Sequence, residues 1–336
     1  MGRHLTIHLG GALATVLVAC VVPMLAASLI SEGWVVVLST FALAAPILVG
    51  AFTAKVVRWI RTPIAFRIPL TVGQQRSLRT IPHERVGAPH TAGQVLLRAL
   101  LDIVLFRPLT RATPTARLLA LGLDHGTTRT LWLAAGLFHT SLAVILIRHL
   151  RMFFEPVPGF VRWLEDVDSL GEMTLPRIHL SSVALVLALL FLFGRRLWLV
   201  RLRYISLAAD YFPLFLLMAI ASAGLVLRHA LATNVPAVKQ VVTGLASGVL
   251  APPAAADPFL VVHLFLVGVL LVYFPLGKLM HMPGTWLSPT LTMANTTRER
   301  RHVNPNNPCV EVLHYAAYED SFRGPMIEAG LPVEKE

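Results

Sequence analysis

Long apolar segments alternate with polar ones along this chain, and the apolar segments determine its fold class. A helix that crosses a bilayer needs about 20 mostly apolar residues. Six stretches meet that requirement and predict six transmembrane helices, at residues 8–30, 33–52, 131–153, 179–200, 208–232 and 259–280. The pattern therefore predicts an all-α protein, a polytopic membrane helical bundle.

The composition agrees with a membrane location. Of 336 residues, 55% are hydrophobic and only 14% are charged, and the mean hydropathy is +0.68. A chain with this composition cannot bury its apolar surface in one water-soluble core.

The basic residues of the connecting segments predict the orientation of the bundle. Residues 53–130 and 195–203 are strongly basic, 156–176 is acidic, and 233–258 is nearly uncharged. Because Lys and Arg concentrate on the cytoplasmic side of a membrane, we expect both termini in the cytoplasm and the bundle in the cytoplasmic (inner) membrane. This topology explains the formal net charge of +11, so membrane lipid is the expected surroundings and nucleic acid is not an expected partner.

The chain divides into four predicted segments. They are transmembrane helices 1 and 2 (1–52), a basic cytoplasmic loop (53–130), transmembrane helices 3 to 6 (131–280) and a cytoplasmic tail (281–336). Within the loop, QVLLRALLDIVLF has the period of an amphipathic helix on the membrane face. In the tail, one short helix is expected before Gly324 and another before Gly330.

Cysteine usage excludes several redox centres. Cys20 lies in the first span and Cys309 in the tail. The chain therefore has no C-x-x-C-H motif for covalent haem, no cysteine cluster for iron–sulfur, and no disulfide framework. Any redox group must be held by other ligands.

Histidines are the main candidate site residues, because ionisable side chains at membrane depth are costly and usually mark a site. Six histidines lie in or at the edge of the spans: His139, His149, His179, His229, His263 and His281. The third span runs outward and the sixth inward. This places His139 with His281 at an inner level, and His149 with His263 at an outer level.

Two levels of paired imidazoles are what two bis-histidine b-type haems require. The rises differ, however: ten residues from His139 to His149 cover about 15 Å, whereas eighteen from His263 to His281 would cover about 27 Å as one helix. Pro275 and Pro283 lie in this region, so we expect a kink or an early helix end that shortens the second rise.

Other interpretations of these histidines remain open on residue types alone. His179 is typical of an interfacial residue bonded to water or to a carbonyl group. His229 beside Arg228 suits a further haem ligand, a quinone contact or a snorkelling neighbour equally. The outer ligand pair thus stays ambiguous among His149, His179, His229 and His263. A proton-coupled transporter that uses membrane histidines as a relay, and a scaffold subunit without cofactor, are the rival classes.

A resemblance selects among these possibilities. The spacings of His139 and His149, and of His263 and His281, resemble those of the di-haem cytochrome b (gamma) subunit of membrane nitrate reductase. Longer strings resemble the DsrM family, the membrane cytochrome b subunits of the DsrMKJOP electron-transfer complex. These strings are AFRIPLTVGQQRSL, FHTSLAVILIRHLRMFFEPVPGF, LRYISLAADYFPLFLL, HLFLVGVLLVYFPLGKLMHMPGTWLSPT and RHVNPNNP.

The resemblance implies two haem b groups, with His139 and His281 as the axial ligands of the inner haem and His149 and His263 as those of the outer haem. It implies electron transfer in dissimilatory sulfur metabolism between a quinone, menaquinone or ubiquinone, and a cytoplasmic iron–sulfur subunit that resembles heterodisulfide reductase. Other subunits of the DsrJOP type are further expected partners, and the tail is expected to lie against the iron–sulfur subunit.

Three cationic residues near the proposed ligands are secondary candidates. Arg148 and Lys278 are expected to contact haem propionates, although ordinary interfacial snorkelling explains them equally well. The quinone is expected beside the outer haem, near Arg228 and His229.

Overall fold

The architecture comes from a computed structural model of the whole chain. It describes residues 2–29, 33–62, 72–78, 80–111, 125–169, 179–231, 234–248, 258–288, 290–295 and 312–335. All regular structure in these ranges is helical.

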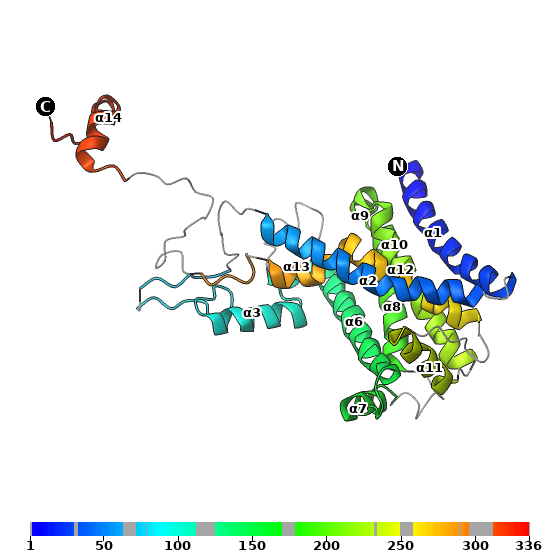
Figure 1. Cartoon of the computed structure of the whole chain (residues 1–336). Coiled ribbons are helices and arrows are strands. Elements are labelled where there is room, and N and C mark those ends of the chain that lie inside the picture. Colours follow the sequence, from blue (N-terminus) through cyan, green and yellow to red (C-terminus); the bar gives the residue numbers. More distant parts are fainter. Residues whose placement is uncertain are drawn as a thin grey trace.

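Six long helices form the bundle, as the sequence predicts (Figure 1). They are α1 (Gly2–Leu29), α2 (Gly33–Arg61), α6 (His125–His149), α8 (Leu180–Trp198), α10 (Ala208–Leu225) and α12 (Pro258–Leu276). Within the described residues, these six are long and apolar enough to cross a membrane, with spans Thr6–Ala26, Ser39–Arg61, Arg129–Met152, Leu180–Trp198, Ala208–Ala230 and Phe259–Leu276. The prediction of a six-span, multi-pass membrane protein is confirmed.

The helices pack in neighbouring pairs around α10. Helix α2 lies along α12, α6 lies along α8, and α10 contacts α1, α8 and α12. One core cluster joins α1, α10 and α12 through Val16, Leu216 and Leu266. A second joins α8 and α10 through Leu189 and Leu217.

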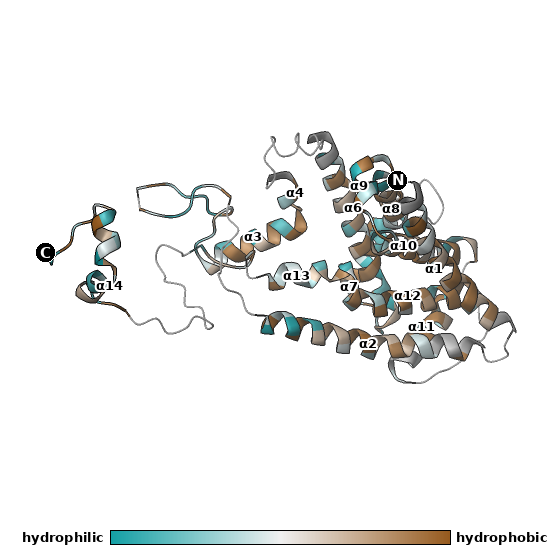
Figure 2. Cartoon of the chain, turned by 90° about the horizontal axis from the view of Figure 1, so that it is seen from above, coloured by the Kyte–Doolittle hydropathy of each residue, from teal (hydrophilic) through white to brown (hydrophobic). Residues whose placement is uncertain are grey.

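The outward faces of these helices are apolar (Figure 2). Leu137, Leu146 and Leu187 are exposed on α6 and α8, although water would not favour a leucine-covered surface of this extent. Lipid is the solvent that matches it.

Helix α2 extends beyond the predicted end of the second span, at residue 52, to Arg61. The basic residues of this extension suit a helix C-terminus, where cations interact favourably with the dipole. Lys55 Nζ also donates to the carbonyl oxygen of Pro275 at 2.9 Å. This bond satisfies one of the carbonyls left open at the end of α12.

Shorter α-helices make up the rest of the described α-helical structure. They are α3 (Ala92–Val104), α4 (Pro108–Arg111), α7 (Gly159–Asp168), α9 (Val200–Ile205), α11 (Val235–Ala246), α13 (His281–Leu287) and α14 (Tyr315–Glu328). The amphipathic α3 confirms the helix expected from QVLLRALLDIVLF. The sequence analysis placed no helix at α7, α9 or α11.

The last span ends early, as the two prolines indicated. Helix α12 stops at Leu276, directly after Pro275, and Gly277 is extended with φ −93° and ψ −172°. One 3-10 turn, η4 (Lys278–Met280), leads into α13, which begins at His281. The chain from His263 to His281 is therefore not one continuous helix, and its rise is shorter than about 27 Å.

Within residues 312–335, one helix stands where two were expected, because α14 continues through Gly324 and Pro325. Glu319 ties the returning chain to this helix by accepting bonds from the backbone nitrogens of Glu334 and Lys335, at 3.0 and 2.9 Å. In both views α14 lies apart from the bundle (Figures 1 and 2). The RHVNPNNP segment, Cys309 and the first part of AFRIPLTVGQQRSL lie outside the described residues.

Candidate functional site

The structure brings the rings of His139 and His281 together in an edge-on arrangement. The ring centres are 6.0 Å apart and the ring planes are nearly perpendicular, at 83°. His139 lies in the middle of α6, and His281 reaches it because the chain breaks at Gly277 and restarts as α13. This is the inner pair predicted from the sequence.

Gly277 is required at this break by a close approach. A Cβ atom at this position would lie 2.6 Å from the ring of Tyr273. That ring is fixed in place, since it packs edge-on against Phe212 and its hydroxyl donates to the carbonyl of Ala209 at 3.4 Å. The tight turn that delivers His281 therefore accepts glycine alone without rearrangement.

The loop after α3 also reaches the inner pair. The ring of Phe106 lies 5.0 Å from that of His139, and Phe106 has a positive φ of 50°. Trp132 Nε1 donates to the carbonyl of Leu105 at 2.6 Å and holds this loop against α6. The basic loop thus contributes an aromatic wall to the site, a contact that the sequence analysis did not foresee.

His149 and His263 form the second level. They are close enough for the charge of one imidazole to act on the other. A Cβ atom at Gly224 of α10 would lie 3.3 Å from Cε1 of His263, so the absence of a side chain there makes room for the ring. The structure thus also brings the predicted outer pair together.

All four imidazoles are oriented in the same way. Nδ1 of His139 and of His149 each lies 2.7 Å from the carbonyl oxygen four residues earlier, of Ala135 and Ile145. Nδ1 of His263 lies 3.1 Å from the carbonyl of Ile220, and that of His281 lies 3.1 Å from the carbonyl of Lys278. A ring that donates from Nδ1 leaves Nε2 unprotonated, which is the state that binds a metal.

This donor set fits haem iron. With metal–nitrogen bonds of about 2 Å, two imidazoles on opposite sides of one metal have ring centres roughly 6 Å apart, as His139 and His281 do. A porphyrin also needs room between its two ligand helices. Backbone contact between α6 and α12 is sparse in the described residues, because α6 packs along α8 and α12 along α2.

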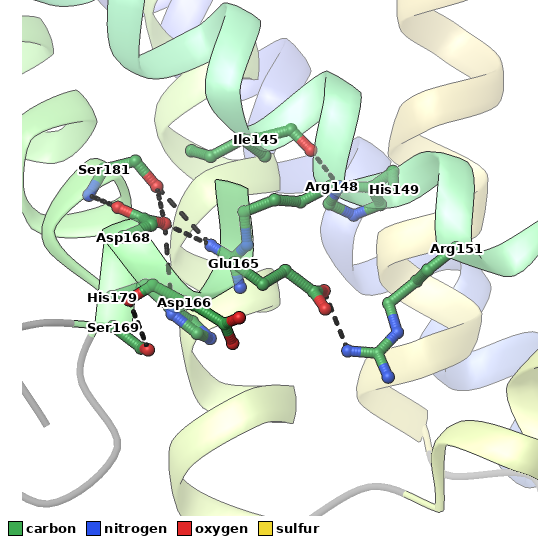
Figure 3. Close-up of polar contacts among 10 residues, drawn as sticks. All are labelled: Ile145, Arg148, His149, Arg151, Glu165, Asp166, Asp168, Ser169, His179 and Ser181. Atoms are coloured by element: carbon green, nitrogen blue, oxygen red, sulfur yellow. Dashed lines mark hydrogen bonds and ion pairs between the residues drawn. The ribbon is translucent and has the colours of Figure 1, made fainter. Parts of the chain in front are cut away.

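A dense ionic cluster surrounds the His149 end of α6 (Figure 3). Arg148 Nη1 donates to Asp168 Oδ2 at 2.6 Å. The same carboxylate accepts from the backbone nitrogen of Ser181 at 2.8 Å and from its hydroxyl at 2.6 Å. His179 lies beside it, with Nδ1 3.9 Å from Asp168 Oδ2.

His179 is buried, where the sequence analysis favoured an interfacial position. His179 is the N-cap residue of α8, its side chain makes no capping hydrogen bond to the described residues, and the residue is 4% exposed. The sequence analysis did not identify Asp168 as a site residue, because its partners lie on α6 and α8 and only the fold brings them together. The α7 helix that carries it was recognisable from Phe160, Trp163 and Val167, which recur at helical spacing.

Arg228 and His229 lie in a π-helical turn, η3 (Val226–Ala230), at the end of α10. The ring of His229 is 6.4 Å from that of His179, and the charge of Arg228 acts on both Arg148 and His179. Short π-helical segments inside α-helices are frequent at functional sites. The two residues thus adjoin the ionic cluster.

Lys278 is paired at the other end of the bundle. Its Nζ donates to Asp210 Oδ1 at 2.6 Å, and Arg196 lies 3.8 Å from the same oxygen. Both predicted propionate contacts, Arg148 and Lys278, therefore have a carboxylate partner from the protein itself.

Comparison with known proteins finds two similar cytochrome b-like subunits. The chain is 38% identical over 262 residues to the Hdr-like menaquinol oxidoreductase cytochrome b-like subunit of Archaeoglobus fulgidus, covering 76% of this chain and 78% of that protein. It is 36% identical over 267 residues to the protein of the same description from Archaeoglobus profundus, covering 77% and 78%.

The chain belongs to this cytochrome b-like family. No family model matches the sequence, so the membership rests on these relatives and on their coverage of both chains. Six spans with imidazoles facing one another across the bundle are consistent with a cytochrome b-like subunit.

Proposed function

We propose that this chain is a di-haem b cytochrome that passes electrons between the quinone pool and a cytoplasmic heterodisulfide-reductase-like iron–sulfur subunit, in dissimilatory sulfur metabolism. The observation that carries the proposal is the inner pair, with ring centres 6.0 Å apart and each Nδ1 held by a backbone carbonyl. The names of the relatives support a quinone-linked redox role. The resemblance to the DsrM family supports the sulfur pathway.

The chain's own residues would hold and orient the cofactors. His139 and His281 would ligate the inner haem, and His149 and His263 the outer one, each through Nε2. Bound haem supplies a one-electron carrier at each level. The Nδ1 bonds fix the planes of the four rings, which sets the strength and geometry of ligation.

Arg148 and Lys278 remain our candidates for propionate contacts. Each would contact the propionate by sharing or exchanging its present partner, Asp168 or Asp210. Exchange is easier for Lys278, whose side chain is 62% exposed, than for Arg148, which is 14% exposed.

The quinone would bind at the end of the bundle that carries His149, beside Arg228 and His229. The π turn and the neighbouring ionic cluster support this place. The relatives' description as menaquinol oxidoreductase subunits favours menaquinone over ubiquinone.

The opposite end of the bundle would face the cytoplasm. There α3, the inner pair and the chain's C-terminal segment would lie on the side of the iron–sulfur partner, with DsrJOP-type subunits completing the complex. The contact of Phe106 with His139 supports this, because it connects the loop directly with the inner haem site.

The test is a reduced-minus-oxidised absorption spectrum of the purified chain with a pyridine haemochrome assay. Two b haems are expected in the wild type and one in each of His139→Ala and His263→Ala, because each variant removes one ligand of a different pair. His90→Ala is the matched control, since His90 Nδ1 also meets a backbone carbonyl, that of Asn295, at 3.2 Å, but belongs to neither pair. A wild type without haem overturns the proposal and favours a proton-coupled transporter.

A further inference from the structure

His179 is buried, and its ring nitrogens lack hydrogen-bond partners among the described residues. Its side chain is 4% exposed, and neither ring nitrogen has a hydrogen-bond partner within the described structure. The closest carboxylate oxygen, Asp168 Oδ2, is 3.9 Å from Nδ1, beyond hydrogen-bond distance. Leaving buried polar atoms without partners costs free energy, so the ring is suited to a ligand that supplies the missing partner.

Asp168 is held rigidly beside this ring. Ser181 donates to it from both backbone nitrogen and hydroxyl, and Arg148 donates at 2.6 Å (Figure 3). Three donors thus converge on one buried carboxylate, and its position is fixed by α6, α7 and α8 together. The negative charge of this fixed carboxylate favours the charged form of the neighbouring imidazole.

Charged and titratable groups act on His179 from three neighbouring elements: Arg148 from the end of α6, Asp168 from α7, and Arg228 and His229 from the π turn. Arg151, Glu165 and Asp166 belong to the same end of the bundle, where Arg151 pairs with Glu165 (Figure 3). His179 lies just ahead of the span Leu180–Trp198. Burial, followed by the positive charge of Arg148, lowers the pKa of His179 to about 4. The ring is therefore neutral at physiological pH and carries a free lone pair.

We infer that His179, supported by Asp168, is the base that accepts a hydroxyl proton of the quinol. The inference rests on the proposed quinone-linked function and assigns a residue to its proton transfer. The unpaired ring nitrogens and the fixed carboxylate carry it, and the ring of His229 at 6.4 Å marks the opposite side of the place where the hydroxyl would lie.

A menaquinol loses two electrons and two protons and becomes the quinone. Bound haem would supply the one-electron acceptors. The O–H bond of the hydroxyl beside His179 breaks with its proton moving to a ring nitrogen, and Asp168 stabilises the imidazolium until the proton leaves to water. The proton of the second hydroxyl, on the opposite edge of the quinol ring, leaves to water. Loss of electrons makes the quinol hydroxyl strongly acidic, so even a weak base receives its proton.

The cluster is well placed for this coupling. Arg148 precedes His149 directly in the chain and pairs with Asp168, so Asp168 and His179 lie near the end of α6 that carries the outer ligand. The charge of Arg148 also acts on His179. Electron and proton acceptors therefore lie on adjacent sides of one helix end.

The experiment uses the purified, haem-loaded protein. Reduction of haem by menadiol is followed by stopped-flow absorption across a range of pH, and binding of 2-heptyl-4-hydroxyquinoline N-oxide is followed by the quenching of its fluorescence. His179→Gln is expected to slow haem reduction at least about tenfold, with inhibitor affinity kept within about threefold of the wild type. In the wild type the rate should decline as the pH falls toward about 4, and His179→Gln should lack this decline.

Arg151→Gln is the matched control. It removes the 2.8 Å ion pair between Arg151 and Glu165, which ties the same helix end to α7 without contacting His179. Its rate should remain within about twofold of the wild type.

Wild-type rate and pH dependence in His179→Gln would overturn the inference and leave the cytochrome proposal intact. A wild type without haem would overturn the proposed function itself. If His179→Gln loses its haem, the pH dependence of haem reduction in the wild type still tests the inference. A wild-type rate that does not decline toward about pH 4 excludes His179 as the base.

Discussion

The two ends of the bundle hold the same kind of imidazole pair by different means. At the α3 end, His281 reaches His139 through a broken helix, with Gly277 packed against Tyr273. At the α7 end, His263 stays in an unbroken α12 and packs closely against Gly224 of α10. One site depends on a turn and the other on close helix packing.

The ion pairs beside the two sites differ in the same way. Arg148–Asp168 and Lys278–Asp210 are equally short, at 2.6 Å, but the side chains of the first pair are 14% and 5% exposed and those of the second 62% and 13%. Because removal of one partner costs most when the other stays buried, we expect the α7 end to be the more sensitive to loss of charge.

The largest expected effect comes from Arg148→Gln. The change leaves the buried carboxylate of Asp168 without its cation, so the free energy of unfolding should fall by about 3 kcal/mol. Thermal loss of the haem absorption band in detergent measures the stability. Arg151→Gln, at a pair with side chains 36% and 17% exposed, is the control and should change it by less than about 1 kcal/mol. Equal losses of stability in Arg148→Gln and Arg151→Gln would contradict the expected difference between the two ion pairs.

Gly277→Ala should affect the α3 end by itself. The added methyl group would lie 2.6 Å from the ring of Tyr273, so the turn must shift at a cost of about 2 kcal/mol. We expect loss of the inner haem with retention of the outer one, measured by pyridine haemochrome and low-temperature spectra. Gly136→Ala in α6, where no atom lies within 4 Å of the new Cβ, should keep both haems.

Gly224→Ala should affect the α7 end more mildly. The new methyl group would lie 3.3 Å from Cε1 of His263, so the ring must move slightly, at about 1 kcal/mol. Both haems should remain, with a changed potential for the outer one alone, measured by redox titration. A changed inner potential with an unchanged outer potential would show that residue 224 does not pack against an outer ligand.

Lys278→Gln should have the smallest effect. Its side chain is largely exposed, so the stability should fall by less than about 1 kcal/mol. Asp210 keeps Arg196 as a neighbour and still accepts from the backbone of Leu207 at 3.1 Å. A loss as large as that of Arg148→Gln, measured in the same thermal experiment, would remove the contrast between the two ends.

The sequence predicted the features that depend on local pattern. The six spans follow from apolar runs, α3 from its amphipathic period, and the early end of α12 from Pro275. We predicted the pairing of the four histidines from their depth in the membrane together with the family resemblance. The fold brings each pair together, and the identity of the ligands is for the haemochrome assay to decide.

The rest of the site depends on contacts between distant segments. The partners of Asp168 come from α6 and from the start of α8, and the carbonyl that orients His263 belongs to Ile220 of α10. Neither contact has a signature in local spacing. The burial of His179 likewise results from the way in which α7, α8 and the π turn meet.

The π turn at the end of α10 changes the direction in which the side chains after it point. Each residue of an α-helix rotates the next side chain by about 100°, and the turn adds one residue, closing with the bond from the nitrogen of Leu231 to the carbonyl of Val226 at 3.1 Å. Leu216 and Gly224, before the turn, face the core and His263. Arg228 and His229, within it, face His179. Deleting one residue here would restore a regular helix and turn Arg228 and His229 away from the cluster, while the packing of α10 against α12 stayed as it is.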